Sequence, residues 1–92
     1  MFLPTVVEEN EAEARLREAA EVARRQGARL WELRAVTSLA RLLSGRGRVK
    51  EAEALLDELL VAFDDQPETP DVGAARRLRR EMPKRESLRV VR

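Results

Sequence analysis

The feature that most constrains the fold is the stretch of residues 31–63, in which a glycine-containing turn joins two amphipathic segments. In both segments apolar residues recur at every third or fourth position, the spacing that places side chains on one face of a helix. Gly45 and Gly47 lie between the segments, where glycine can take the positive φ needed for a reversal at a helix C-terminus. The pattern therefore predicts two antiparallel helices. Their apolar lines are Val36, Leu39, Ala40 and Leu43, then Val49, Ala52, Leu56, Leu59 and Phe63.

Start and stop signals predict one further helix on each side of this hairpin. Thr5 and Glu8 fit a capping box, in which a hydroxyl and a carboxylate satisfy free amides at a helix start. Gly27 is placed to close that first helix. Thr69 and Pro70 provide an N-cap and a first helical residue for the last helix, and Pro83 is expected to end it.

The predicted organisation is one all-α domain of four helices, because Ala, Leu, Glu and Arg dominate the composition and favour helix over sheet. The first helix is expected to bury an apolar line facing its neighbour, at Ala12, Leu16, Ala19 and Ala23. Its outer face should be covered by Phe2, Leu3, Val6 and Val7, or remain a surface for self-association, because repeat arrays need covered ends. The segments are a leader at 1–7, a helical-repeat domain at 8–82 with helices at about 8–26, 30–44, 48–63 and 70–82, and a flexible basic tail at 83–92.

The hairpin resembles a tetratricopeptide repeat, whose pattern places a large residue, Leu-Gly and an aromatic on one helix, then Ala and an aromatic four residues later on the next. Here the matching residues are Val36, Leu39-Ala40, Leu43, Ala52 and Leu56, so aliphatic side chains replace the aromatics. Residues 11–80, through ARRQGARLWELRAVTSLARL followed by GR, EA, LL and TPD, also resemble the C-terminal repeat region of large bacterial signalling ATPases, including those fused to nucleotide cyclase domains.

That resemblance implies antiparallel hairpins of a tetratricopeptide-like α-solenoid, acting as a scaffold that binds proteins in signal transduction. The nucleotide-binding and cyclase motifs of that family have no counterpart in this sequence. No apolar run approaches the roughly 20 residues that span a bilayer, and the N-terminus lacks the pattern of a signal peptide. A cytoplasmic location is therefore expected.

The composition offers little material for catalysis. His, Cys and Tyr are absent, so acid-base or nucleophilic chemistry would fall to Asp, Glu, Lys, Ser or Thr. The early acidic residues Glu8, Glu9, Glu11 and Glu13 are interpreted as a solvated helix face. Residues 44–47 lack the spacing and the Lys-Ser/Thr of a phosphate-binding loop. We expect no enzymatic activity, no cofactor and no metal site.

One stripe on the first hairpin helix is a candidate partner site, made of Arg34, Thr37, Arg41 and Ser44. These residues recur at steps of three, four and three on the side away from the apolar line, which faces the concave groove in tetratricopeptide-like folds. Two guanidiniums there would suit an acidic peptide or a C-terminal carboxylate, and a merely solvated face is the alternative. Trp31 is interpreted as a partly buried wedge between hairpins, with ligand stacking as the alternative.

The charge is uneven along the chain although the net charge is only +1. Residues 48–70 hold two basic and seven acidic side chains, whereas residues 71–92 hold eight basic and three acidic ones. Four arginines of the basic segment form a possible polyanion contact, but no aromatic is interleaved for base stacking. Pairing with the acidic segment is the competing interpretation. The four are Arg76, Arg77, Arg79 and Arg80.

The sequence thus favours a protein-binding module, whose partner would be a protein or an acidic peptide. Two alternatives remain open. One is a small nucleic-acid-binding helical protein that uses the C-terminal arginines, and the other is a self-associating fragment, a homodimer through an exposed repeat end, without a ligand of its own.

Overall fold

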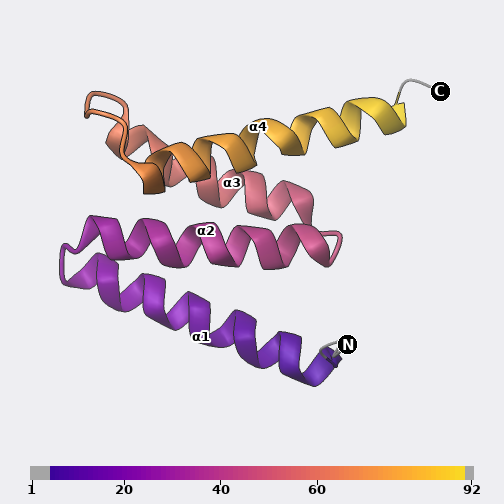
Figure 1. The fold of residues 1–92 in the computed structure, drawn as a ribbon. Coiled ribbons are helices and arrows are strands. Elements are labelled where there is room, and N and C mark those ends of the chain that lie inside the picture. The colour runs from indigo at the N-terminus through magenta and orange to yellow at the C-terminus, as the bar shows by residue number, and fades with distance from the viewer. Residues whose placement is uncertain (1–4, 91–92) are drawn as a thin grey trace.

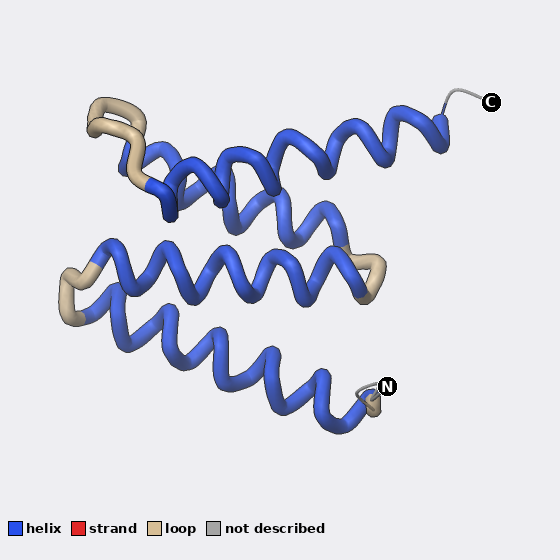
Figure 2. Tube along the Cα trace, in the orientation of Figure 1, coloured by secondary structure: helices blue, strands red, loops and turns tan. Residues whose placement is uncertain are grey.

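The computed structural model describes residues 5–90, with side chains through Met82, and is all-helical over that range (Figures 1 and 2). Four α-helices and one 3₁₀ helix follow one another along the chain. The predicted all-α class is therefore confirmed. The elements are α1 (Val6–Arg25), α2 (Arg29–Gly45), α3 (Val49–Leu60), η1 (Val61–Phe63) and α4 (Pro70–Val90).

A capping box begins α1, as the sequence predicts. The Glu8 amide donates to the Thr5 hydroxyl oxygen at 3.1 Å, and the Thr5 amide donates to the Glu8 carboxylate at 2.9 Å. The helix therefore begins at Val6, two residues before the expected position. Val6 and Val7 are 64% and 65% exposed, so these residues do not cover the outer face of α1. Phe2 and Leu3 lie outside the described residues.

Two glycines of positive φ end α1 and α2, which confirms the predicted reversals. Gly27 has φ of 71° and Gly47 has φ of 83°, whereas Gly45, the other glycine expected between the two hairpin helices, is the last residue of α2 and has no positive φ. At the first turn the Ala28 amide donates to the Ala23 carbonyl at 2.9 Å, and the Arg48 amide donates to the Leu43 carbonyl at the same distance in the second turn. Both turns are Schellman motifs, in which the left-handed residue lets the chain satisfy the last free carbonyls of a helix.

Helix α2 is at the centre of the fold, because it contacts α1, α3 and α4. Figure 1 shows α1 and α4 at opposite edges of the molecule, and α4 also packs on α3. The core is one apolar cluster, and the predicted apolar lines of residues 36–43 and 52–63 lie largely within it. Among its fully buried members are Leu33, Leu39, Ala40, Leu43, Ala52, Leu56 and Ala75.

The predicted apolar line of α1 is only partly correct. Ala23 is buried and Leu16 is half-buried, but Ala12 and Ala19 are exposed. The side of α1 that faces α2 is instead rotated by about one residue, so that Ala20 and the carboxylate of Glu13 point inward, the latter with only 13% of its side chain exposed. The interpretation of Glu13 as part of a solvated face is therefore wrong.

The prediction that Pro83 ends the last helix is also wrong, because α4 continues to Val90. A proline inside a helix removes one backbone donor and crowds the preceding turn, which costs about 3 kcal/mol. Most of the residues around Pro83 are good helix formers, such as Arg, Glu, Met, Lys and Leu, which favour continuation. The predicted N-cap is confirmed, since the Val72 amide donates to the Thr69 hydroxyl oxygen at 3.3 Å. None of the described helices is both long and apolar enough to cross a membrane.

Candidate protein-binding groove

A groove of about 520 Å³ lies between α1 and α3, with α2 as its floor. Val36 and Leu39 of α2 are buried at its base, and the side chains above them are only half-buried, which leaves apolar surface open to solvent. We call this cavity the α1–α3 groove. Its apolar lining consists of Ala20, Val36, Leu39, Leu55, Leu59 and Ala62.

Charged residues of both signs form the rim of the α1–α3 groove. On α1, Glu21 accepts a hydrogen bond from Arg24 and lies 4.0 Å from Arg25. Arg29 and Glu58 are exposed on the rim, from α2 and α3 respectively. The rim therefore presents neither a purely basic nor a purely acidic surface. Its charged members are Arg17, Glu21, Arg24, Arg29, Glu32 and Glu58.

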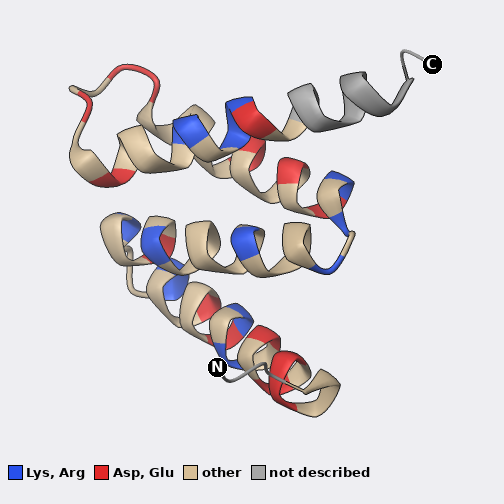
Figure 3. Ribbon diagram, turned by 45° about the vertical axis from the view of Figure 1, so that its right-hand side comes forward, with Lys and Arg blue, Asp and Glu red and all other residues tan. Residues whose placement is uncertain are grey.

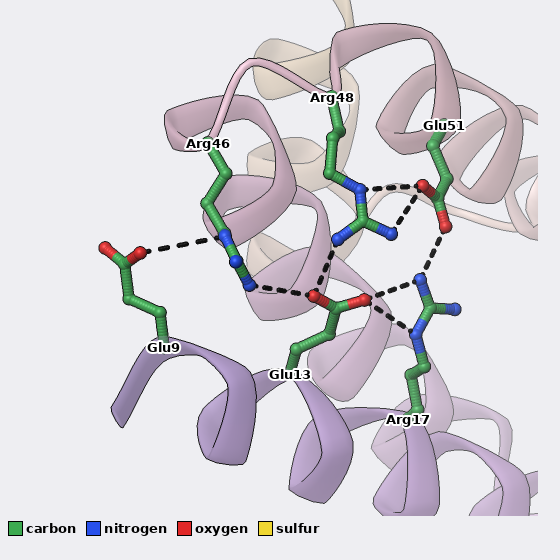
Figure 4. A network of polar contacts seen from close by, with 6 residues as sticks. All are labelled: Glu9, Glu13, Arg17, Arg46, Arg48 and Glu51. Carbon is green, nitrogen blue, oxygen red and sulfur yellow. Dashed lines mark hydrogen bonds and ion pairs between the residues drawn. The ribbon is translucent and has the colours of Figure 1, made fainter. Parts of the chain in front are cut away.

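A cluster of three arginines and three glutamates joins the first half of α1 to the turn between α2 and α3 (Figure 4). The carboxylate of Glu13 is its centre. It accepts hydrogen bonds from Arg17 at 3.0 and 3.1 Å, from Arg46 at 3.1 Å and from Arg48 at 2.8 Å. We call this group the Glu13 cluster. Its members are Glu9, Glu13, Arg17, Arg46, Arg48 and Glu51.

The Glu13 cluster also ties α1 directly to α3. Arg17 of α1 donates to Glu51 of α3 at 2.5 Å, and Arg48 donates to the other oxygen of the same carboxylate at 2.8 and 3.0 Å. Arg17 is at the same time a lining residue of the α1–α3 groove. Through Arg17 the cluster therefore borders the groove, and it joins α1 to α3 there.

Hydrogen bonds within the Glu13 cluster change the acidity of its carboxyl groups. Burial raises the pKa of Glu13, but the hydrogen bonds from Arg17 and Arg48, together with their positive charges, outweigh burial and leave this pKa below its ordinary value of 4.5. The hydrogen bonds from Arg17 and Arg48 likewise lower the pKa of Glu51. The pKa values of both arginines are raised in return, chiefly by the hydrogen bond from Arg17 to Glu51 and by that from Arg48 to Glu13. Glu13, Arg17, Arg48 and Glu51 are thus ionised near neutral pH.

The four residues of the predicted partner-binding stripe on α2 have different environments in the structure. Thr37 is buried with 7% exposure and its hydroxyl donates to the Leu33 carbonyl at 2.7 Å, so the prediction that it faces a partner is wrong. The small hydroxyl can be satisfied inside the helix, which allows it to enter the core. Arg41 is exposed and Ser44 is half-buried. Arg34 is half-exposed and donates to Asp71 of α4 at 3.1 Å.

Trp31 is not the partly buried wedge that the sequence predicts, because 62% of it is exposed. The guanidinium of Arg34 lies over the indole ring, 4.9 Å from its centroid, in a cation–π contact. Asp71 of α4 accepts a hydrogen bond from the same guanidinium. The partner of this tryptophan is therefore an arginine on its own helix rather than a neighbouring hairpin.

The C-terminal arginines fall into two pairs. Arg79 donates to both carboxylate oxygens of Asp57, at 2.7 and 3.0 Å, and Arg76 donates to the Phe63 carbonyl at 3.2 Å. Arg77 and Arg80 are exposed. Pairing between the basic and acidic segments is confirmed for Arg79, which leaves fewer of these guanidiniums available for a polyanion.

Sequence reasoning missed the α1–α3 groove and the Glu13 cluster. Glu13 and Arg17 are four residues apart, a spacing that indicates an ion pair within a helix. The long-range partners of Glu13, Arg46 and Arg48, lie in the α2–α3 turn, and no sequence pattern links these arginines to α1. Leu59 belongs to the predicted apolar line of α3 and Leu55 lies beside that line, and neither was expected to face a groove.

The fold and the groove define a small all-helical protein with an open apolar cleft bordered by charges of both signs. Within the part of the chain whose side chains are described, no group of acidic residues is arranged to hold a metal ion. Comparisons with protein-family models, with curated proteins and with solved structures find no match to this chain.

Proposed function

We propose that this chain is a non-enzymatic protein-interaction module whose α1–α3 groove binds an amphipathic helix of another protein. The observation that carries the proposal is the half-buried apolar lining of the groove. Leu55, Leu59 and Ala62 recur at steps of four and three along the wall that α3 and η1 form. An amphipathic helix places its own apolar side chains at the same spacing, which is how helices dock in hydrophobic grooves.

The charges of the rim favour a protein helix over a polyanion. Arg29 and Glu58 lie on the same rim with opposite signs, so a uniformly acidic ligand would meet repulsion as well as attraction. Helices that pack with one face buried commonly carry residues of both signs along the edges of that face. Such a helix can pair with the rim while its apolar residues cover the lining.

The architecture supports a scaffold role of tetratricopeptide type. Helix α2 packs between its neighbours α1 and α3 and also contacts α4. In repeat arrays, too, each helical unit packs on the units beside it. The two reversals at Gly27 and Gly47 use the same motif, as successive turns of a repeat array would. Together with the resemblance of residues 11–80, these features favour a terminal part of a bacterial signalling ATPase scaffold.

The proposal is tested by selecting a displayed library of helix-forming peptides on the wild-type chain. Enriched peptides are expected to share apolar positions at steps of three and four, and to bind the Ala20→Gln variant much more weakly, because the longer polar side chain enters the groove. Ala14→Gln is the matched control, since Ala14 is exposed on the same helix and does not line the groove. No enrichment, or equal binding to both variants, contradicts the proposal.

A further inference from the structure

A second apolar hollow, of about 410 Å³, lies on α1 and the start of α2 and shares no residue with the α1–α3 groove. Its main apolar members are large and exposed, Val22 to 36% and Trp31 to 62%. Ala19 and Ala28 form the rest of its apolar lining, together with Ala23 at its base. We call this surface the Trp31 hollow. An indole that is mostly exposed beside an apolar hollow is typical of an interaction surface, where tryptophan is enriched.

The exposed side of α1 continues the Trp31 hollow toward the start of the helix. Ala12, Arg15, Ala19 and Val22 are all exposed and follow one another at steps of three, four and three, so they form one stripe along α1. Two of the four side chains are no larger than a methyl group. A second helix could therefore approach the backbone of α1 closely along this stripe.

The two ends of α1 differ in charge, with Arg15, Arg17, Glu18 and Glu21 between them. The first turn carries Glu8 and Glu9, and the last turn carries Arg24 and Arg25 (Figure 3). Two parallel copies of this helix would place like charges together. Two antiparallel copies would place the acidic end of each beside the basic end of the other, so this pairing would occur twice because of the two-fold symmetry.

We propose that the Trp31 hollow and the exposed stripe of α1 form the interface of a symmetric homodimer, in which α1 packs antiparallel on α1 of a second copy. Val22 of one copy lies opposite Ala12 of the other in this arrangement, and Arg25 lies near Glu8 and Glu11 at the acidic start of the other α1. Each Trp31 lies beside Val22 and therefore covers Ala12 of the other copy. The complementarity lies within a single helix, which is why a second copy fits better than a different protein.

The dimer is tested by sedimentation equilibrium over a range of protein concentrations, with tryptophan emission recorded on the same samples. Trp31 is the single tryptophan of the chain, so its emission reports this surface alone. The wild-type chain is expected to form dimers as the concentration rises, with a blue shift of the emission that follows the dimer fraction. The association is expected to weaken with added salt, because the charge pairs are exposed.

Two sets of variants separate this interface from others. Val22→Arg is expected to raise the dissociation constant at least about tenfold, as for a residue at the centre of an interface. Val61→Arg is the matched control, because Val61 is 67% exposed on η1 and lies outside both cavities. Arg25→Glu is expected to weaken the dimer, and adding Glu11→Arg to the same chain should restore it.

A wild-type chain that stays monomeric at all concentrations overturns the proposal. It is equally overturned by a dimer that Val22→Arg leaves unchanged, since another surface would then hold the copies together. A dimer in which Arg25→Glu has no effect at low salt would contradict the antiparallel arrangement.

Discussion

Arg48, the residue before α3, donates a hydrogen bond of 2.8 Å to the carboxylate of Glu13 in α1, across a separation of 35 residues in the sequence. The remaining arginines of the cluster also contact Glu13, so this carboxylate is the main link between α1 and the α2–α3 turn, with the ion pair of Glu9 and Arg46 at 3.6 Å beside it (Figure 4). Since α1 is an edge helix, this contact fixes its position and therefore the width of the α1–α3 groove at one end.

Replacing Glu13 by Gln should therefore destabilise the protein. The substitution removes the charge that three guanidiniums share, and hydrogen bonds to charged groups contribute about 1.5 to 3 kcal/mol each when they are removed. Because the arginines remain partly exposed and water can solvate them, we expect a loss of about 1 to 3 kcal/mol in the free energy of unfolding measured by urea denaturation. Glu11→Gln, on an exposed position of the same helix, should change it by less than about 0.5 kcal/mol.

The lowered pKa values of Glu13 and Glu51 predict a loss of stability in acid. A carboxyl group whose pKa is lower in the folded than in the unfolded chain stabilises the fold fully above its ordinary pKa, here 4.5. That contribution is lost as the pH falls from there through the folded pKa. The stability difference between wild type and Glu13→Gln, from urea denaturation at a series of pH values, should therefore be constant near neutral pH and shrink below about pH 4.5. A difference that grows in acid would contradict the assignment.

Two nearby glycines should respond in opposite ways to the same substitution. Gly47 has φ of 83° and Gly45 lies within α2, and a Cβ at either position meets no atom within 4 Å. Gly47→Ala should cost about 1 to 2 kcal/mol, because the left-handed conformation is strained for alanine. Gly45→Ala should instead stabilise the chain by up to about 1 kcal/mol, since alanine favours the helix. Thermal melts followed by circular dichroism compare the two, and equal effects would show that φ at Gly47 is not positive.

Continuation of α4 through Pro83 can be observed directly. The Cα chemical shifts of residues 84–89 in the wild-type chain should be helical, because α4 extends to Val90. Pro83→Ala should then stabilise α4, by up to about 3 kcal/mol, since proline is that much less favourable than alanine inside a helix. Pro67→Ala, in the loop before α4, is the control. Helical shifts that stop at Met82 would instead support a helix that ends at the proline.

The sequence predicted the parts of the fold that depend on local patterns. The capping box at Thr5 and Glu8, the reversals at Gly27 and Gly47 and the buried line of α2 all follow from rules that involve a few neighbouring residues. The cap of α4 by Thr69 belongs to the same group. Such features need no knowledge of what the helices pack against.

The errors lie where contacts between distant residues decide the outcome. Glu13 was predicted to be solvated because its partners Arg46 and Arg48 are remote in sequence. With Glu13 facing inward, α1 is rotated so that Ala12 and Ala19 are exposed. Thr37 was predicted to bind a partner because helical periodicity alone does not show that α1, α3 and α4 all pack on α2. Thr37 is buried by this packing. The α1–α3 groove depends on the distance between two helices that are not consecutive in the chain. A local sequence pattern does not predict that distance.

The most direct test of the proposed function is to map the binding of an enriched helical peptide on the amide spectrum of the isotope-labelled chain. Peptide binding in the α1–α3 groove predicts shifts at Ala20, Leu55 and Leu59, from both walls, with little change at Arg34 and Arg41. Shifts confined to Arg34 and Arg41 would contradict the groove and return the partner site to the stripe on α2.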